Sequence, residues 1–392
     1  MRLGADVLLT DQRGLLQGKK VGLLAHPASL DSRGKHLLGL LLAEKKDWQV
    51  TALFGPEHGI TGESLYMEPV ESTTHQPSGL PAFSLYGKTL KSLSPKKNML
   101  DLIDCLVIDL QDVGTRYYTY IWTATLCMEA CAKYKKPVIV CDRPNPINGV
   151  TVEGELNEKG YASFVGLYPV PVRHGMTIGE IAHFINDVHD LNCDLTVVPM
   201  ERWQRKWYWK ETELRWVNPS PNIRSPLQAL FYPGMCLLEA TNVSEGRGTG
   251  TPFEIAGAPF VEPKPLIDMM KEWNLPGVRL EPVDFKPEAG QKWGGQLCKG
   301  IKLHLIERES FKPYATGIAL LWAIHYLCQD RGFQWRIEPY EFIEDIPAID
   351  LLTGGTKVRQ GIERHLPLPE ILEWVGEPSE NFLRQRTPYL FY

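Results

Sequence analysis

The stretch Gln49-Val-Thr-Ala-Leu-Phe-Gly-Pro-Glu-His-Gly-Ile-Thr-Gly62 joins a strand pattern to a stiff turn. Residues 49–54 are β-branched and apolar after a polar start, which predicts a buried strand. The strand pattern ends at Gly-Pro, and three glycines within eight residues allow positive backbone φ angles. Such a turn can hold Glu57 and His58 rigidly at the end of a strand, where open α/β sheets bind ligands. The same residues are also compatible with a plain tight turn that carries a solvated glutamate.

Similar apolar strands alternate with helix patterns through the first two thirds of the chain. The expected strands cover residues 19–26, 49–54, 82–86, 105–110, 137–141, 194–200 and 235–240. The expected helices cover residues 31–46, 119–134 and 177–189, the last of which begins with a capping box of Thr177 and Glu180. Continuous apolar strands that alternate with helices are typical of a parallel sheet covered on both faces. The predicted fold class is therefore α/β, with a Rossmann-like, mostly parallel sheet.

A second domain is expected after the parallel sheet. Three prolines lie close together from residue 259, and a smaller α/β pattern with one strong helix at residues 315–329 follows them. At 392 residues and 44.4 kDa, the chain is long enough for two packed domains. We predict a Rossmann-like catalytic domain of residues 1–257 and a smaller α/β auxiliary domain of residues 258–392.

Charge and hydropathy exclude several classes of partner. The net charge of −5 argues against a nucleic-acid partner, because phosphate binding needs concentrated lysine and arginine. No run of eighteen apolar residues occurs, so no membrane span is expected. Residues 1–10 lack the apolar core of a signal peptide. We therefore expect a cytoplasmic protein, or a secreted or periplasmic one from which a leader has been removed.

The cysteines and the common cofactor motifs give no sign of a metal or cofactor site. Eight cysteines occur without a C-x-x-C pair, which favours buried free thiols over a disulfide framework. The frames of a phosphate-binding loop, a zinc-protease helix and a nucleophile elbow are all absent. A metal cluster of Glu57, His58, Asp109 and His174 is conceivable. We nevertheless predict no cofactor.

Four loops that follow predicted strands carry most of the polar residues of interest. Besides Glu57 and His58, these loops hold Asp109, Asp112, Arg116, Tyr118, Asp142, Arg143, Asn145, Asn242, Glu245 and Arg247. If the strands are parallel, all four loops meet at the carboxyl edge of one sheet. Carboxylates, arginines and aromatic rings together suit a sugar site that also binds an anionic group. Two structural alternatives stay open: Tyr117, Tyr118, Tyr120 and Trp122 can belong to the core, and Arg116 can pair with Asp112.

Several long phrases resemble a known family in the right order along the chain. They are Leu53-Phe-Gly-Pro-Glu-His-Gly59, Asp109-Leu-Gln-Asp-Val-Gly-Thr-Arg-Tyr-Tyr-Thr-Tyr120, Asp142-Arg-Pro-Asn-Pro146, His174-Gly-Met-Thr-Ile-Gly-Glu180, Pro219-Ser-Pro-Asn222, Asn242-Val-Ser-Glu-Gly-Arg-Gly-Thr249 and Pro388-Tyr-Leu-Phe-Tyr392. These phrases resemble the exo-acting β-N-acetylmuramidase family, long known only as a domain of unknown function. The resemblance implies a Rossmann-like catalytic domain with an auxiliary domain behind it. It also implies removal of terminal N-acetylmuramic acid from the non-reducing ends of peptidoglycan fragments or muropeptides.

The resemblance makes Glu57 the leading catalytic candidate, and we expect it to act as general acid with His58 holding or tuning it. The second carboxyl group would be Asp109, Asp112 or Glu245, unless the 2-acetamido group of the sugar is the nucleophile. Arg143 and Arg247 are expected at the lactyl carboxylate. Further candidates for substrate binding are Arg116, Tyr118, Asp142, Asn145, His174, Asn222 and Glu245. A non-catalytic muropeptide-binding protein and a metal-dependent hydrolase of another bond are the competing hypotheses.

Overall fold

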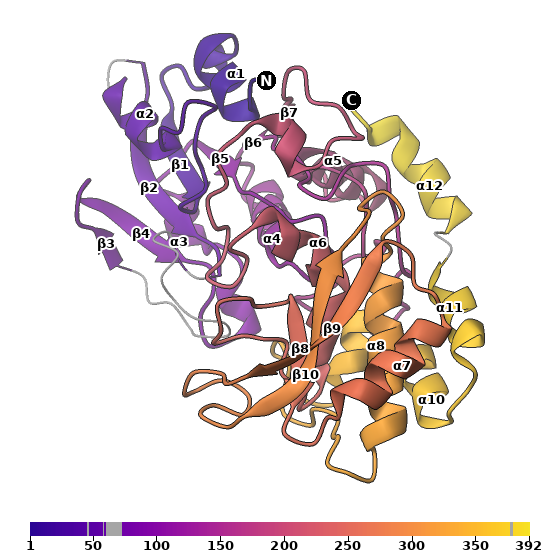
Figure 1. Ribbon diagram of the computed structural model, residues 1–392. Helices are drawn as coiled ribbons and strands as arrows, with labels where there is room; N and C mark the ends of the chain where they lie inside the picture. The colour runs from indigo at the N-terminus through magenta and orange to yellow at the C-terminus, as the bar shows by residue number, and fades with distance from the viewer. Residues whose placement is uncertain (45–46, 58, 60–72, 377–378) are drawn as a thin grey trace.

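A seven-stranded sheet forms the N-terminal part of the computed structural model, which describes residues 1–392 except 45–46, 58, 60–72 and 377–378 (Figure 1). Its strands, in spatial order, are β3 (Thr73–His75), β4 (Leu80–Ser84), β2 (Gln49–Gly55), β1 (Lys20–Ala25), β5 (Cys105–Asp109), β6 (Val138–Cys141) and β7 (Leu195–Val198). All neighbouring pairs are parallel except β3 with β4. The predicted mostly parallel α/β sheet is confirmed.

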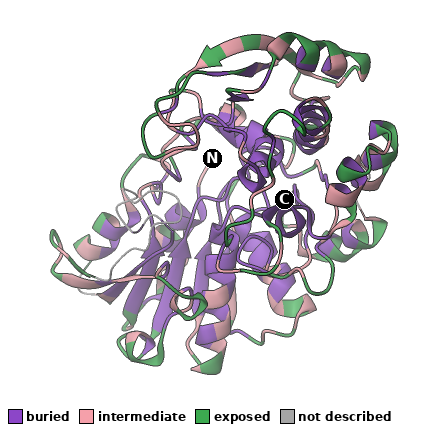
Figure 2. Cartoon of the chain, turned by 90° about the horizontal axis from the view of Figure 1, so that it is seen from below, coloured by how far each residue is buried: buried purple, intermediate pink, exposed green. Residues whose placement is uncertain are grey.

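The central strands are apolar on both faces because helices cover both faces. Along β1, Val21 and Leu23 belong to one hydrophobic core, whereas Leu24 points into the other, as the two-residue period of a strand requires. Helices α1 (Gly4–Thr10) and α2 (Leu37–Ala43) supply the first core, and α4 (Tyr120–Lys133) and α5 (Ile178–Val188) supply the second. Figure 2 shows the resulting burial: the central strands β1, β2, β5 and β6 are mostly purple, whereas the edge of the sheet is pink and green.

Helix starts were predicted with mixed success. The capping box at the start of α5 is present, with Thr177 and Glu180 each bonded to the other's backbone. The helix expected from residue 31 begins instead at Leu37, after His36. Asp31 does not cap it, because its side chain accepts hydrogen bonds from the backbone of Arg33 and Lys35 and closes a turn.

The strand predicted at residues 235–240 is wrong. This segment ends α6 (Pro226–Met235) and continues as the 3-10 helix η4 (Cys236–Ala240). Ser225 caps α6, and Pro226 occupies its first turn, where the missing N–H costs nothing. Residues 228–240 are buried on every side, and periodicity alone cannot distinguish such a segment from a buried strand.

A smaller antiparallel sheet with helices forms the C-terminal part. Its strands follow the order β8 (Ile255–Ala258), β10 (Cys298–Leu305) and β9 (Val278–Phe285). The remaining helices are α3 (Lys97–Leu100), α7 (Pro263–Glu272), α8 (Pro313–Cys328), α9 (Ala348–Thr353), α10 (Lys357–Glu363), α11 (Leu368–Gly376), α12 (Glu380–Arg386) and the 3-10 helices η1 (Arg13–Leu15), η2 (Leu90–Ser92), η3 (Trp209–Thr212) and η5 (Thr387–Tyr389). The predicted boundary between residues 257 and 258 stays a prediction.

The two parts are packed closely together. Helices α6 and α8 meet at Gly234 and Gly317, where a Cβ on Gly317 would lie 2.4 Å from the backbone of Gly234. The chain end also returns to the first sheet, because the Tyr392 hydroxyl donates to Asp142 Oδ2 at 2.6 Å. No helix within the described part of the chain has the length and apolarity to cross a membrane.

Candidate active site

A buried acidic pocket lies beside the loop that follows β2. Its lining includes Glu57, Tyr118, Asn222, Arg247, Glu239 and Glu341, so four of the predicted site residues meet there. The N-terminal part of the chain contributes Glu57 and three tyrosines, Tyr117, Tyr118 and Tyr120. The segments around η4 and residue 341 close the opposite side. Among the described lining residues, three are carboxylic acids and one is a cation.

In the sequence, Glu57 lies two residues beyond the end of β2. In space, its side chain contacts the residue that precedes α4. The Thr119 hydroxyl donates to Glu57 Oε2 at 2.9 Å, and Thr119 is the residue that precedes the first turn of α4. The Tyr120 hydroxyl donates to the Glu57 carbonyl at 3.4 Å and to the Pro219 carbonyl at 2.7 Å. The N-terminus of a helix favours negative charge, so this position suits a carboxylate. His58 lies outside the described residues.

Glu341 is a site residue that sequence reasoning missed. It is almost fully buried in the same pocket, and the Tyr86 hydroxyl donates to its Oε2 at 3.1 Å. Burial and then the negative charge of Glu57 raise the pKa of Glu341 well above its ordinary value. Its backbone φ is 45°, and that of Phe342 is 68°, a left-handed conformation that non-glycine residues rarely adopt. The surrounding sequence carries no motif that would have identified this residue.

A network of ion pairs holds Arg247 against the pocket. Its Nη2 lies 2.5 Å from Glu239 Oε1, and its Nε lies 3.1 Å from Glu245 Oε1. Glu245 Oε2 in turn binds Lys292 Nζ at 2.9 Å, and Glu239 Oε2 accepts a hydrogen bond from the Tyr340 hydroxyl at 3.0 Å. Glu245 therefore supports Arg247 from behind, whereas Glu239 and Tyr340 line the pocket directly.

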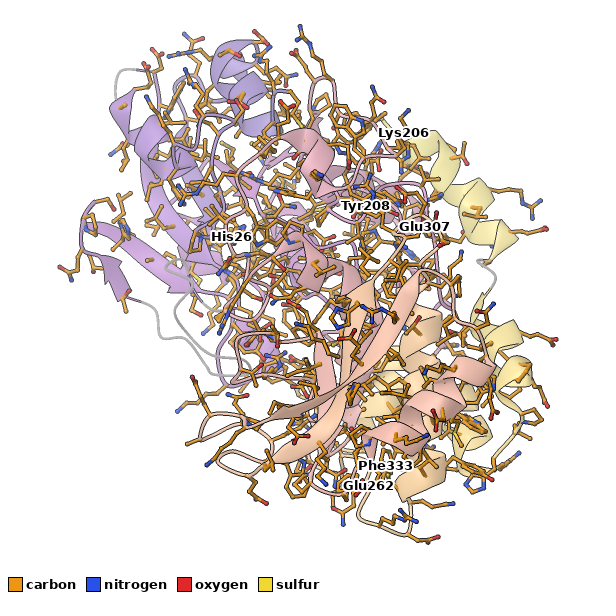
Figure 3. All side chains as sticks on the ribbon, in the orientation of Figure 1. His26, Lys206, Tyr208, Glu262, Glu307 and Phe333 are labelled. Carbon is orange, nitrogen blue, oxygen red and sulfur yellow. The ribbon has the colours of Figure 1, made fainter. Side chains whose placement is uncertain are left out.

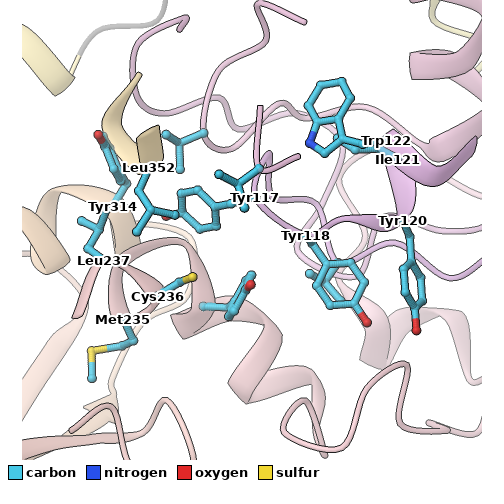
Figure 4. Packing of buried hydrophobic residues seen from close by; sticks show 14 of the residues in the cluster. Tyr117, Tyr118, Tyr120, Ile121, Trp122, Met235, Cys236, Leu237, Tyr314 and Leu352 are labelled. Carbon is cyan, nitrogen blue, oxygen red and sulfur yellow. The ribbon is translucent and has the colours of Figure 1, made fainter. Parts of the chain in front are cut away.

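The aromatic residues after β5 divide between the pocket and the core. Tyr118 and Tyr120 line the pocket with ring centroids 4.8 Å apart, and their hydroxyls point the same way (Figure 4). Trp122 lies fully in the core, where its Nε1 donates to the Arg116 carbonyl at 2.7 Å. The Tyr117 hydroxyl donates to the Pro233 carbonyl. Tyr117, Tyr118 and Tyr120 therefore line the pocket, whereas Trp122 belongs to the core; stacking on a sugar ring stays a prediction.

Asp109 and Arg143 form a buried pair with each other. Arg143 Nε lies 2.5 Å from Asp109 Oδ1 and its Nη2 lies 2.8 Å from Oδ2, a bidentate geometry. Arg143 Nη2 also donates to the Leu30 carbonyl. The two side chains lie at the carboxyl ends of β5 and β6, as predicted, yet neither is among the residues that line the acidic pocket.

Other predicted site residues form their hydrogen bonds and ion contacts within the protein. Arg116 donates to the carbonyls of Glu155, Val170 and Leu352, not to Asp112. Asp112 Oδ2 accepts from Gly114 N at 2.7 Å and lies 3.4 Å from His174 Nε2. The hydrogen bond from Arg116 to the Leu352 carbonyl ties a loop of the N-terminal part to α9 in the C-terminal part.

Asp142 and Asn145 also form hydrogen bonds within the protein. Asp142 accepts hydrogen bonds from Thr177 Oγ1 and Gly179 N, both at 2.8 Å, at the start of α5. Burial and then the charge of Glu180 raise the pKa of Asp142 to about 7. Asn145 Nδ2 donates to the Met176 carbonyl at 2.9 Å.

The residue types that ligate metals are spread over the described part of the structure. Within the described ranges, no three His, Cys, Asp or Glu side chains gather as a metal would require. All eight cysteines are free and buried, which confirms the prediction of buried thiols. Of the conceivable metal cluster, Glu57 lines the acidic pocket while Asp109 is bonded to Arg143.

The mostly parallel α/β sheet carries an acidic, tyrosine-lined pocket beyond the end of one strand, and these features together suit an enzyme that cleaves carbohydrates. Comparisons with known proteins identify the family. Residues 21–227 match the family described as Exo-beta-N-acetylmuramidase NamZ, N-terminal, and residues 230–392 match the one described as Exo-beta-N-acetylmuramidase NamZ, C-terminal. The chain belongs to the exo-β-N-acetylmuramidase NamZ family, as the sequence resemblance implied.

Similar proteins match over the whole chain. The peptidoglycan beta-N-acetylmuramidase NamZ of Bacillus subtilis (strain 168) is 40% identical over 392 residues, which cover 100% of this chain and 91% of that protein. Two crystal structures of DUF1343 family proteins from Bacteroides fragilis NCTC 9343 also match, each over 100% of this chain and 98% of the other. They are 32% and 29% identical, with TM-scores of 0.88 and 0.78.

Proposed function

We propose that this protein is a glycoside hydrolase that releases terminal N-acetylmuramic acid from the non-reducing ends of peptidoglycan fragments or muropeptides. The observation that carries the proposal is the pair of Glu57 and Glu341, two buried carboxyl groups that line one pocket. Family membership supports the reaction class, because the Bacillus subtilis relative is named a peptidoglycan beta-N-acetylmuramidase.

The two carboxyl groups supply the acid and the negative charge that glycosidic cleavage requires. One group must protonate the leaving oxygen, and a second must stabilise or attack the anomeric carbon. Burial and the charge of Glu57 raise the pKa of Glu341, so Glu341 holds its proton to a higher pH than an ordinary glutamate does. In the proposed reaction the two carboxyl groups together hold one proton and one negative charge when the substrate binds.

The proton of the pair reaches the glycosidic oxygen through Glu57. Glu57 is 6% exposed and Glu341 is 1% exposed, so Glu57 is the member closer to an entering substrate. The glycosidic oxygen takes this proton and leaves with the electron pair of its bond to the anomeric carbon. The charge that stays on the pair stabilises the positive anomeric carbon, and water adds there directly or after attack by the 2-acetamido oxygen. The proton that the water loses returns to the pair.

Arg247 is the residue that we assign to the lactyl carboxylate of the muramic acid. It is the cation among the described residues that line the pocket, and Glu239 and Glu245 orient its guanidinium. A planar guanidinium matches a carboxylate. Arg143, the other expected partner, does not line this pocket and is bound by Asp109, so we assign the role to Arg247 alone.

The test compares aryl glycosides of N-acetylmuramic acid and N-acetylglucosamine side by side, with and without a chelator. We expect turnover of the muramide, unchanged by the chelator. Glu57→Gln should lose most of this turnover while its thermal unfolding stays cooperative. Glu158→Gln, which changes an exposed glutamate, serves as the matched control and should retain wild-type turnover.

Each competing hypothesis predicts a different result. A muropeptide-binding protein would bind the muramide saturably without releasing the aryl group. A metal-dependent hydrolase would lose its activity with the chelator. Near-normal turnover of Glu57→Gln would refute the role of Glu57.

A further inference from the structure

The acidic residue Glu341 lies in a tight turn whose backbone conformation is costly. Tyr340 and Ile343 exchange two backbone hydrogen bonds, each 3.0 Å long. Glu341 and Phe342 lie between them with positive φ angles of 45° and 68°, the pattern of a type I′ turn. Asparagine and glycine usually occupy these two central positions, and residues with larger side chains are strained there. Contacts from the rest of the protein must therefore hold this turn in place.

Tyr86, from the N-terminal part of the chain, supplies such contacts. It lies two residues beyond the end of β4 and is 2% exposed. Its hydroxyl donates to Glu341 Oε2 at 3.1 Å. Its ring packs edge-on against Phe342 with centroids 5.7 Å apart, and Phe164 packs against the same ring at 5.9 Å. One tyrosine therefore contacts both central residues of the strained turn.

A second buried tyrosine also joins the two parts of the molecule. The Tyr208 hydroxyl donates to the Arg308 carbonyl at 3.0 Å, and Figure 3 labels Tyr208 close to Glu307, the residue before Arg308. Tyr208 is 8% exposed and does not line the acidic pocket. Its hydroxyl bonds a carbonyl, which does not titrate, whereas the hydroxyl of Tyr86 bonds a carboxyl group. Tyr208 therefore provides a comparison for a contact that joins the parts without touching an acid of the pocket.

Tyr86 contacts the acid without lining the pocket. Glu341 is among the residues that line the acidic pocket, and Tyr86 is not. Burial and the charges of Glu57 and Glu341 raise the pKa of Tyr86 well above its ordinary value, so its hydroxyl keeps its proton and can donate. Burial and the charge of Glu57 raise the pKa of Glu341, and the bond from Tyr86 opposes this rise, because a donor favours the ionised carboxylate.

The charged groups that face Glu341 come from several elements. The loop after β2 provides Glu57 and η4 provides Glu239, and both charges raise the pKa of Glu341, whereas Arg336 lowers it. Arg247 lines the same pocket and is paired with Glu239. The other titratable groups of the described pocket lining are Tyr117, Tyr118, Tyr120, Tyr232 and Tyr340. A substitution that removes only the hydroxyl of the tyrosine after β4 leaves all of these groups in place.

We propose that Tyr86 is a positioning residue for the cleavage reaction: its hydroxyl fixes the Glu341 carboxyl group, and its ring holds the strained turn that carries this group. The proposal rests on the proposed hydrolase function and deepens it. The N-terminal part of the chain thereby fixes the position of an acid that the C-terminal part supplies. Loss of the hydroxyl frees the carboxyl group to rotate while the rings still pack.

Tyr86→Phe removes the hydroxyl and keeps the ring contacts. Its kcat on an aryl N-acetylmuramide should fall about tenfold, the effect of losing one hydrogen bond to a charged group, while KM stays within about twofold of wild type. The alkaline limb of the kcat profile should move to higher pH, because Glu341 loses a donor that favours its ionised form. A merely structural contact would lower activity without moving this limb. The matched control, Tyr208→Phe, should leave both kcat and the limb unchanged.

A double substitution tests whether Tyr86 acts through Glu341. In a Glu341→Gln background, Tyr86→Phe should lower kcat no further, because effects of residues that act as one unit are not additive. A further loss of about tenfold in that background would overturn the proposal. Near-normal kcat of Tyr86→Phe, or an alkaline limb that this variant leaves in place, would overturn it as well.

The titration of Glu341 tests the contact without any turnover. ¹³C NMR of the side-chain carboxyl carbons follows the glutamates, and the signal absent from Glu341→Gln identifies Glu341. In Tyr86→Phe this signal should titrate at a higher pH than in wild type, and in Tyr208→Phe at the wild-type pH. An unchanged titration in Tyr86→Phe would overturn the proposal. If the titration moves but wild-type protein cleaves no aryl N-acetylmuramide, the proposed function fails and Tyr86 still stands as the residue that holds Glu341.

Discussion

Replacing Glu341 with glutamine tests the catalytic pair most directly. The substitution keeps the size of the side chain and an oxygen that can accept the Tyr86 hydroxyl, which lies 3.1 Å from Glu341 Oε2. It removes the carboxyl group whose pKa the charge of Glu57 raises. General acid–base groups contribute about 10²- to 10⁴-fold to rate, so kcat on an aryl N-acetylmuramide should fall by about that factor.

The same substitution should change how stability depends on pH. Burial and the charge of Glu57 raise the pKa of Glu341, so the folded state binds this proton more tightly than the unfolded state does. The resulting stabilisation is complete below the pKa of the unfolded chain and is lost as the pH rises toward the folded pKa. In this window each pH unit lowers the free energy of unfolding by at most about 1.4 kcal/mol. Glutamine does not ionise, so the variant should lack this slope.

The assay combines kcat between pH 5 and 9 with urea unfolding over the same range. Wild-type activity should fall as the pH rises through the raised pKa of Glu341, and wild-type stability should fall with it. The control is Glu344→Gln, an exposed glutamate in the same segment, which should behave as wild type in both measurements. A Glu341→Gln variant with near-normal kcat would refute the catalytic pair. Parallel stability curves for this variant and wild type would refute the pKa argument.

Three further substitutions separate substrate binding from structure. Arg247→Gln should raise the relative turnover of N-acetylglucosaminides over N-acetylmuramides, and an unchanged ratio would remove its proposed role. Asp109→Asn leaves the Arg143 guanidinium buried without its partner, so urea unfolding should reveal a loss of about 3–5 kcal/mol; wild-type stability would contradict this. Gly317→Ala forces a Cβ against Gly234 and should cost about 3 kcal/mol or more, whereas an unchanged Tm would mean that α6 and α8 can separate freely.

The sheet could be predicted from sequence because its strands carry their own evidence. Residues of β1 and β5 are apolar at consecutive positions, a pattern that is typical of a strand buried on both faces. The segment at residues 235–240 is equally apolar, yet it forms the 3-10 helix η4. A segment that is buried from all sides lacks the hydrophobic periodicity that distinguishes a helix from a strand, and this is why a strand was wrongly predicted there.

The positions of the polar residues at strand ends were predicted correctly from the sequence, but their bonding partners were not. Asp109 is the last residue of β5, and Asp142 follows β6 directly. A buried carboxylate must find donors, and these two find them in Arg143 and at the start of α5 rather than in an open cleft. Sequence identifies which residues need a partner, but only the fold decides whether the partner is protein or ligand.

The acidic pocket depends on both parts of the chain. The loop after β2 supplies Glu57, while Glu239, Arg247 and Glu341 come from segments that follow α6. Glu341 comes from the C-terminal part, near the far end of the sequence, and burial and the charge of Glu57 raise its pKa. The C-terminal part therefore lines the pocket as well, and the Rossmann-like sheet without it would present Glu57 but not Glu341.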